Sequence, residues 1–198
     1  EHNEQSLRVV ESLEGDGRGL NLTDAVRDGI LNHTGSGVPA TLEGQVVRLM
    51  DRVAYVNHDI DDALRAGVIR EDEMPAGEVA LLGATTSQRL TTLVGDVVDA
   101  SRDAPEIRQS PEIGASFLRL RRFMFQRVYH GSPAADEAAR GEGVVWALFL
   151  WLYDHPEELP PSHEPDLVTR VADHVAGMTD RYALRQYRAT FMPREGPL

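Results

Sequence analysis

Apolar residues recur at helical spacing along almost the whole chain, whereas runs that alternate apolar and polar residues are scarce. Because an α-helix repeats about every 3.6 residues and a strand every two, this pattern predicts an all-α protein. We find no internal repeat, low-complexity tract or obvious linker in it. Loops rich in glycine, serine and proline bound the helices, which we expect at about residues 1–14, 23–33, 41–66, 77–83, 86–101, 111–129, 133–154, 164–176 and 179–191.

The long helical segment 41–66 has two different faces. Thr41 is the expected N-cap and Gly67 the expected residue just past the C-terminal end. At about 100° per residue, the apolar face is formed by Leu49, Val53, Val56, Ile60 and Leu64. The opposite, acidic face is formed by Asp51, Tyr55, Asp59, Asp62 and Ala66. The apolar face is predicted to lie in the core.

Two interpretations of the acidic face stay open at this point. It faces water, as the polar face of an amphipathic helix usually does, or Asp59 points into a cleft as a carboxylate ligand for a divalent ion. The adjacent His58 does not share such an ion easily, because neighbours on a helix diverge by about 100°. One carboxylate is too few for a metal site, so other ligands would have to come from elsewhere.

Composition and charge narrow the function classes. The chain has 198 residues, a formal net charge of -12 and a pI near 5.0, which argues against an extended nucleic-acid-binding surface. It has no cysteine, so disulfides, thiolate metal sites and cysteine nucleophiles are excluded, and a reducing cytoplasm is the expected location. The longest apolar run, 144–152, is too short to span a bilayer, so no membrane partner is expected.

Five stretches carry a resemblance to a known family. They are HNEQSLR (2–8), GLNLT (19–23), LEGQVV (42–47), DRVAYVNHDIDDA (51–63) and AGMTDRYA (176–183). In order and spacing they are similar to bacterial deoxyguanosine triphosphate triphosphohydrolase-like proteins of the HD superfamily. The resemblance covers nearly the whole chain.

The resemblance implies a multi-helix HD-domain-like bundle that lacks the N-terminal helices carrying the H…HD motif. Residues 1–70 would be the C-terminal part of the catalytic domain, and 71–198 a helical region packed on it. The family hydrolyses deoxynucleoside triphosphates (dNTPs) to deoxynucleoside and triphosphate with a divalent ion such as Mn²⁺ or Mg²⁺. Asp59 matches the last metal-ligand aspartate, and the other ligands would lie upstream. The chain alone is therefore expected to be inactive, with the missing N-terminal segment as its partner.

Four further residues are candidates for substrate contacts. His2 matches a histidine near the substrate phosphates, and the alternative is a surface histidine at a frayed end. Arg8 is a candidate phosphate contact or an ordinary surface arginine. Tyr55 would line the cleft near the sugar or pack in a helical interface. Asp62, on the same face as Asp59, completes the substrate-binding set.

Two other groups attract attention. Arg119, Arg121, Arg122 and Arg127 form a basic cluster that would either bind a regulatory nucleotide or be a solvated face. Trp146, Phe149, Leu150 and Tyr153 recur at helical spacing and are interpreted as core or as an oligomer interface. The alternative function, a non-catalytic helical assembly or nucleotide-sensing module, also predicts a homo-oligomer.

Overall fold

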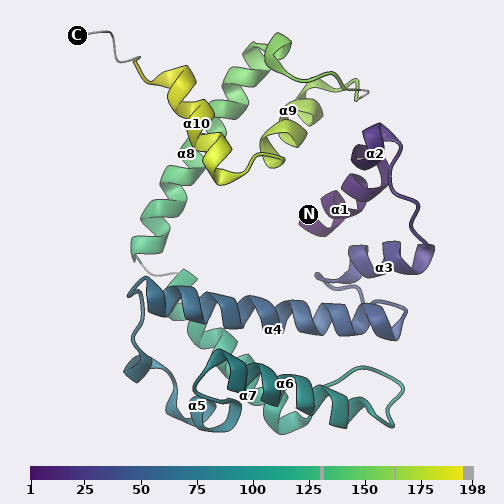
Figure 1. The fold of residues 1–198 in the computed structure, drawn as a ribbon, viewed down its shortest axis with the longest axis vertical. Coiled ribbons are helices and arrows are strands. Elements are labelled where there is room, and N and C mark those ends of the chain that lie inside the picture. Colours follow the sequence, from purple (N-terminus) through teal and green to yellow (C-terminus); the bar gives the residue numbers. More distant parts are fainter. Residues whose placement is uncertain (130–131, 163, 194–198) are drawn as a thin grey trace. The chain divides into compact units, whose positions relative to one another are not determined.

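The computed structural model describes residues 1–129, 132–162 and 164–193, and every regular element in these residues is helical. The chain folds into two compact units, 1–131 and 132–198. The all-α prediction is therefore confirmed (Figure 1). The boundary predicted near residue 70 marks the end of the family's catalytic domain, which is a different division from these two compact units. It stays a prediction.

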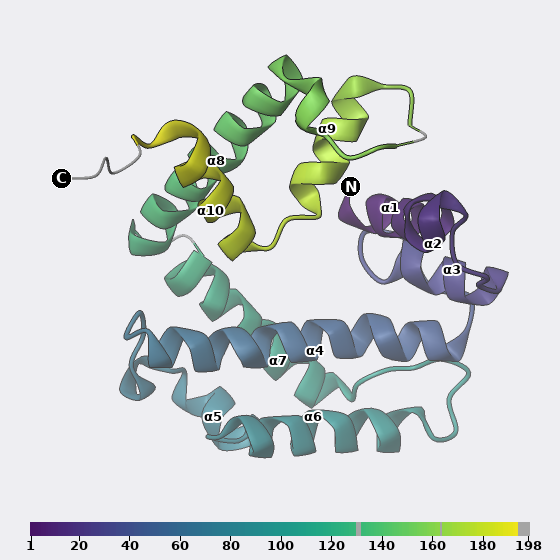
Figure 2. The same ribbon diagram turned by 45° about the horizontal axis from the view of Figure 1, so that its top comes forward.

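The first unit contains seven α-helices and three short turns among its described residues. They are α1 (His2–Arg8), the π-helical turn η1 (Val9–Leu13), α2 (Glu14–Gly17), α3 (Asp24–Asn32), α4 (Leu42–Arg65), the 3₁₀ turn η2 (Glu71–Glu73), α5 (Ala76–Leu82), α6 (Thr86–Ser101), α7 (Pro111–Met124) and the π-helical turn η3 (Phe125–Tyr129). Helix α4 packs against α3, α6 and α7, while α1 packs on α3 (Figure 2).

The predicted two faces of α4 are present. Thr41 caps the helix by accepting a hydrogen bond from the Gly44 amide, and Gly67 follows its end with φ +68°. Val53, Val56 and Ile60 are buried, in a core shared with Leu82, Leu93, Phe117, Leu120 and Met124. The predicted core face is thus confirmed, with Leu49 and Leu64 at its half-buried edges.

A buried arginine joins α6 to α4. The Arg89 side chain is only 2% exposed, and its Nε donates to Asn57 Oδ1 at 2.7 Å. Its two Nη groups donate to the Ala84 carbonyl at 2.9 Å and to Thr86 Oγ1 at 2.9 Å. Asp61 Oδ1 lies 3.5 Å from Nη2 and supplies the opposite charge. Because Asn57 and Asp61 are one helical turn apart, this network fixes the rotation of α4 about its axis.

The predicted helix 1–14 is interrupted. It ends as α1 at Arg8, continues as η1, and then turns through Gly15, Asp16 and Gly17, which all have positive φ. Left-handed backbone is easy for glycine but not for most other residues, so the glycine-rich segment bends the chain instead of extending the helix. The predicted helix 111–129 likewise closes in a π-helical turn, η3.

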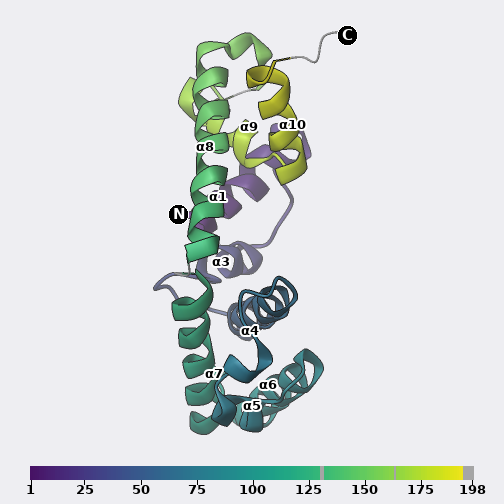
Figure 3. The same cartoon turned by 90° about the vertical axis from the view of Figure 1, so that its left-hand side faces the viewer.

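The second unit is formed by α8 (Ser132–Asp154), the 3₁₀ turn η4 (Pro156–Glu158), α9 (Leu167–Ala176) and α10 (Asp180–Phe191). Both α9 and α10 pack on α8 (Figure 3). Leu152, Leu159 and Val171 form its buried centre. Thr179 caps α10 by accepting from the Tyr182 amide at 3.3 Å.

Most of the aromatic stripe of α8 lies outside the core. Trp146 is 61% exposed, and Leu150 and Tyr153 are exposed as well, while Phe149 is half-buried and stacks on Trp146 with ring centroids 6.0 Å apart. The core interpretation is wrong for Trp146, Leu150 and Tyr153, because α9 and α10 pack on the side of α8 that carries Leu148 and Leu152. Phe149 does pack against the buried centre of this unit. The use of the stripe as an oligomer interface stays a prediction.

Candidate active site

The acidic face of α4 carries the predicted site residues. Asp51, Tyr55 and Asp62 are exposed, and Asp59 is half-buried. The apolar face and the Arg89 network hold α4 from the other side, so the backbone beneath these residues is rigid. The interpretation that this face points away from the core is confirmed.

Asp59 has a partner that sequence reasoning does not find. The hydroxyl of Tyr129, 70 residues away in the chain, donates a hydrogen bond to Asp59 Oδ2. Tyr129 is the last residue of the π-helical turn η3, and such a turn changes the direction of the side chains that follow an α-helix. No sequence spacing links the two residues, because the contact depends on how α7 and η3 pack beside α4.

The environment keeps the Tyr129 phenol protonated. Burial raises its pKa above the ordinary value of 10.0, and the hydrogen bond to Asp59 and the negative charge of that carboxylate raise it further. A phenolate beside a carboxylate would be repelled, so the neutral donor form is favoured. Tyr129 is therefore the O–H donor of the pair, and Asp59 Oδ2 is the acceptor.

Aromatic rings surround this pair. The Tyr55 and Tyr129 ring centroids are 6.1 Å apart, and the Phe125 ring meets Tyr129 edge-on at 4.9 Å. Tyr55 is 57% exposed, so a small molecule can reach one side of its ring. Asp59, Tyr55 and Tyr129 together form what we call the Asp59 cluster.

Two arginines lie within electrostatic reach of each other next to this cluster. Burial lowers the pKa of Arg52, and the guanidinium groups of Arg48 and Arg121 lower it further, while Asp51 opposes the shift. Arg48 is already engaged, because it donates to the carbonyls of Asn32, Thr34, Gly35 and Gly37. The positive charges of Arg52 and Arg121 repel each other, so an anion bound between the two guanidinium groups would be stabilised.

The arginines of the predicted basic cluster, on α7 and η3, have different partners in the structure. Arg119 pairs with Glu78 at 2.5 Å and Arg127 with Glu73 at 2.6 Å, so both tie α7 and η3 to neighbouring segments. Arg121 instead lies over the Phe125 ring, 5.0 Å from its centroid. Of this cluster, Arg121 is the member that the structure brings toward the Asp59 cluster, since Phe125 also contacts Tyr129.

The remaining predicted residues lie elsewhere on the unit. His2 is exposed on α1, with its ring 5.2 Å from that of His33 in an edge-to-face arrangement. Arg8 is half-buried at the end of α1. Asp62 pairs with Arg65 at 2.9 Å on the exposed side of α4. Their predicted contacts with substrate stay predictions.

The described residues do not form a metal site on their own. They contain no group of three or more histidine, aspartate or glutamate side chains arranged to hold an ion. Asp59 offers one carboxylate, of which Oδ2 already accepts from Tyr129. A divalent ion needs at least two or three further ligands, so metal binding requires groups from outside the described chain.

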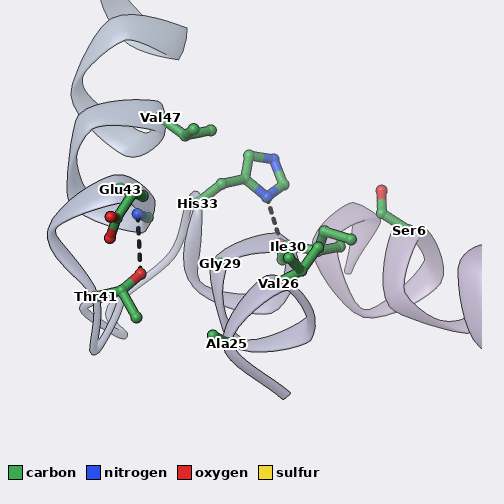
Figure 4. A pocket seen from close by; sticks show the side chains of 10 residues that line it. Ser6, Ala25, Val26, Gly29, Ile30, His33, Thr41, Glu43 and Val47 are labelled. Atoms are coloured by element: carbon green, nitrogen blue, oxygen red, sulfur yellow. Dashed lines mark hydrogen bonds between the residues drawn. The ribbon is translucent and has the colours of Figure 1, made fainter. Parts of the chain in front are cut away.

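A cavity of about 660 Å³ in the first unit lies at α3 and the start of α4 (Figure 4). Three of its polar side chains are engaged: Ser6 donates to the His2 carbonyl at 2.8 Å, His33 Nδ1 lies 2.7 Å from the Ile30 carbonyl, and Thr41 caps α4. Apolar residues, including Val26 and Val47, and the exposed side chain of Glu43 complete the lining. None of its lining residues belongs to the Asp59 cluster.

Comparison with known proteins shows which proteins the chain is similar to. Residues 107–189 match the model of the Phosphohydrolase-associated domain. The chain is 46% identical over 197 residues to a Deoxyguanosinetriphosphate triphosphohydrolase-like protein of Caldanaerobacter subterraneus subsp. tengcongensis, and 42% identical over 207 residues to a protein of the same name from Clostridium perfringens strain 13. Over nearly its whole length the chain is thus similar to part of deoxyguanosinetriphosphate triphosphohydrolase-like proteins. The resemblance predicted from the five sequence stretches is confirmed.

The chain spans only part of the length of these triphosphohydrolase-like relatives. The two matches cover 97% and 98% of the chain but 58% and 60% of the relatives. A third member of the family, from Ralstonia pickettii, is 33% identical over 248 residues, with 96% of this chain and 64% of the relative covered. Within the residues that the structure describes, no helix is long and apolar enough to cross a membrane.

Proposed function

We propose that the intact protein hydrolyses dNTPs to deoxynucleoside and inorganic triphosphate, and that this chain supplies part of the substrate site. The observation that carries the proposal is the arrangement on one surface of a carboxylate acceptor, two phenol rings and two arginines. A dNTP has the matching groups: sugar hydroxyls, a planar base and a polyanion. The names of the relatives support the same reaction class.

The sugar is proposed to bind at the Asp59 cluster. A carboxylate accepts hydrogen bonds from hydroxyl groups. The hydrogen bond that the Tyr129 hydroxyl donates to Asp59 fixes the orientation of the carboxylate. The exposed Tyr55 ring provides a flat apolar wall beside it.

The triphosphate is proposed to extend toward Arg52 and Arg121. Guanidinium groups match phosphate oxygens with paired donors, and binding an anion would relieve the repulsion that lowers the pKa of Arg52. His2 and Arg8, from α1, are proposed as further phosphate contacts, and Asp62 as an outer polar contact to substrate.

A divalent ion, Mn²⁺ or Mg²⁺, is proposed as cofactor, with Asp59 as the ligand from this chain and the other ligands from the segment upstream. When bound, such an ion acts as a Lewis acid on a phosphate oxygen. Asp51, two helical turns earlier on the same exposed face, is the competing candidate for the ligand. Should Asp51 hold the ion, Asp59 would keep the sugar contact that its hydrogen bond with Tyr129 favours.

The proposed reaction is a displacement at the α-phosphorus. The oxygen of water forms a bond to that phosphorus, and the bond from phosphorus to the 5′ oxygen of the sugar breaks. The electron pair goes to the 5′ oxygen, which takes up a proton. The arginines would stabilise the negative charge of the phosphoryl group as it develops.

The test uses the protein extended to its natural start, each dNTP in turn, Mn²⁺ or Mg²⁺, and water enriched in ¹⁸O. Phosphorus NMR is expected to show triphosphate whose terminal phosphorus carries the isotope shift of one ¹⁸O. Addition of a chelator is expected to stop the reaction. Release of no triphosphate from any dNTP, with other dNTPs present as activators, would leave the assembly or nucleotide-sensing module as the better explanation.

Asp59 and Asp51 can be separated by measuring metal content directly. We expect Asp59→Asn to lower bound Mn²⁺, measured by electron paramagnetic resonance, by at least about tenfold at fixed free metal. Full metal binding in Asp59→Asn together with its loss in Asp51→Asn would assign the ligand to Asp51.

A further inference from the structure

The outer face of α7 carries a hollow in which apolar and cationic side chains meet. Its volume is about 390 Å³, and it is lined by Leu118, Arg121, Arg122 and Phe125. Leu118 and Phe125 are both exposed, so two large apolar side chains face solvent here. Leu118, Arg122 and Phe125 recur at i, i+4 and i+7, and they therefore form one ridge along the helix.

Arg122 is the cation of this ridge that has no partner. The Arg121 guanidinium lies over the Phe125 ring, and its charge also acts on Arg52. Arg122 is exposed and makes no hydrogen bond, ion pair or ring contact with the described residues. The sequence has no carboxylate between residues 113 and 129, so α7 and η3 offer it none. The hollow is thus suited to an apolar group with a carboxylate beside it.

The exposed stripe of α8 offers large apolar groups. Val145, Trp146, Leu150 and Tyr153 are all exposed along one side of this helix. Phe149 stacks on the Trp146 ring, yet Trp146 remains 61% exposed, so much of the indole is free to contact another surface. Exposed apolar patches of this kind mark interaction surfaces.

One unpaired carboxylate lies on the same side of α8. Glu142 is one helical turn before Trp146, and it is exposed without a hydrogen bond or ion pair to the described residues. Arg140 is the other charged residue between 138 and 153, and at about 100° per residue it points roughly 160° away from Glu142. The stripe therefore carries a single negative charge, next to its most exposed aromatic ring.

We propose that the α8 stripe of one copy of this chain packs into the α7 hollow of a second copy, with Glu142 paired with Arg122. Trp146 lies one turn from Glu142, while Leu118 and Phe125 lie about one turn on either side of Arg122, so the indole meets an apolar side chain in either helix direction. Both surfaces belong to the same chain, so a two-fold dimer contains this contact twice. Tryptophan, tyrosine and arginine are also the residues that carry most of the binding energy at protein interfaces.

Charge favours a protein partner over a polyanion. One unpaired arginine beside exposed leucine and phenylalanine is not the row of cations that nucleic acid requires. The net charge of -12 makes two copies repel each other at long range. At 0.15 M salt the Debye length is about 8 Å, so this repulsion is screened while an ion pair in contact persists.

Sedimentation velocity of residues 1–198 over about 1 to 200 µM measures the association. We expect a dimer whose fraction rises with concentration. Arg122→Glu and Glu142→Arg are each expected to raise its dissociation constant by about tenfold or more. Glu137→Arg is the matched control, because Glu137 lies on another side of α8, where it pairs with Arg140 at 3.2 Å. It should dimerise as the parent does.

Mixing the two charge-reversed variants tests whether the contact joins two copies. In either variant alone, positions 122 and 142 carry like charges, which repel each other in both contacts of the dimer. In a mixed dimer, each contact brings a carboxylate against a guanidinium. We therefore expect an equal mixture of Arg122→Glu and Glu142→Arg to associate to within about threefold of the parent.

The proposal is overturned if the parent stays monomeric over the whole concentration range. Equal dissociation constants for the parent and the two charge-reversed variants would also overturn it, as would a mixture that associates no better than each variant alone. Circular dichroism identifies a variant that fails to fold, and Trp146→Ser, at an exposed position, then takes its place with the same expected weakening. None of these results depends on triphosphate release by the intact protein.

Discussion

At the scale of single residues, the pair formed by Asp59 and Tyr129 is the most informative contact. The sequence indicates Asp59 and Tyr55 because they share one face of a helix. It does not indicate Tyr129, because a contact across 70 residues leaves no trace in periodicity. The sequence indicates Arg121 as part of a basic cluster but not its proximity to Arg52, since that depends on how α4 and α7 pack.

The raised pKa of Tyr129 makes stability depend on pH above about 10. The unfolded phenol ionises near 10.0 and the folded one only at higher pH, so the contribution of this group is fully present below pH 10 and is lost as the pH rises toward the folded value. We expect the free energy of unfolding to fall more between pH 9 and pH 11 in the parent than in Tyr129→Phe. Urea denaturation of residues 1–198 at both pH values measures this.

Tyr153→Phe is the control, because Tyr153 is exposed on α8 and has no carboxylate partner within the described part of the chain. It should show the same pH dependence as the parent. An identical fall in the parent and in Tyr129→Phe would contradict the described environment of Tyr129.

At the scale of elements, hydrophobic periodicity predicts α4 and α6 almost to the residue. Both have side-chain caps, at Thr41 and Thr85, and an uninterrupted apolar face. Periodicity is less successful where the backbone departs from the α-helix. The turns η1 and η3 continue an apolar pattern while changing the hydrogen bonding, so the sequence alone predicts single helices there.

The Arg89 network is predicted to be the main polar link between α4 and α6. Arg89→Ala would leave Asn57 and the Ala84 carbonyl without their buried partner, and we expect a loss of about 3 kcal/mol in the free energy of unfolding. Chemical denaturation of residues 1–198 measures it.

Arg65→Ala is the matched control, since the ion pair of Arg65 with Asp62 is exposed. It is expected to cost less than about 1 kcal/mol. Equal losses in the two variants would mean that Arg89 is not the link described here.

At the scale of the whole molecule, the chain consists of two helical units, each with its own buried centre. The all-α class and the similarity to triphosphohydrolase-like proteins could be predicted from the sequence, because both depend on local pattern and motif order. The exposed aromatic stripe of α8 could not, since periodicity shows that a helix has an apolar face but not what covers it. For the same reason the number of subunits stays open to measurement.

The proposed catalysis also belongs to this scale, because the described part of the chain carries the Asp59 cluster but no complete metal-ligand set. The central claim is that the Asp59 cluster contacts substrate. The protein extended to its natural start therefore provides the test, with Asp59→Asn compared with Asp99→Asn, an exposed aspartate paired with Arg102 on α6.

The most direct measurement is the rate of triphosphate release from the preferred dNTP at saturating and at low substrate. We expect Asp59→Asn to lower kcat/KM by about 100-fold or more, while Asp99→Asn stays within about twofold of the parent. Triphosphate release by Asp59→Asn at the rate of the parent would contradict the proposed contact.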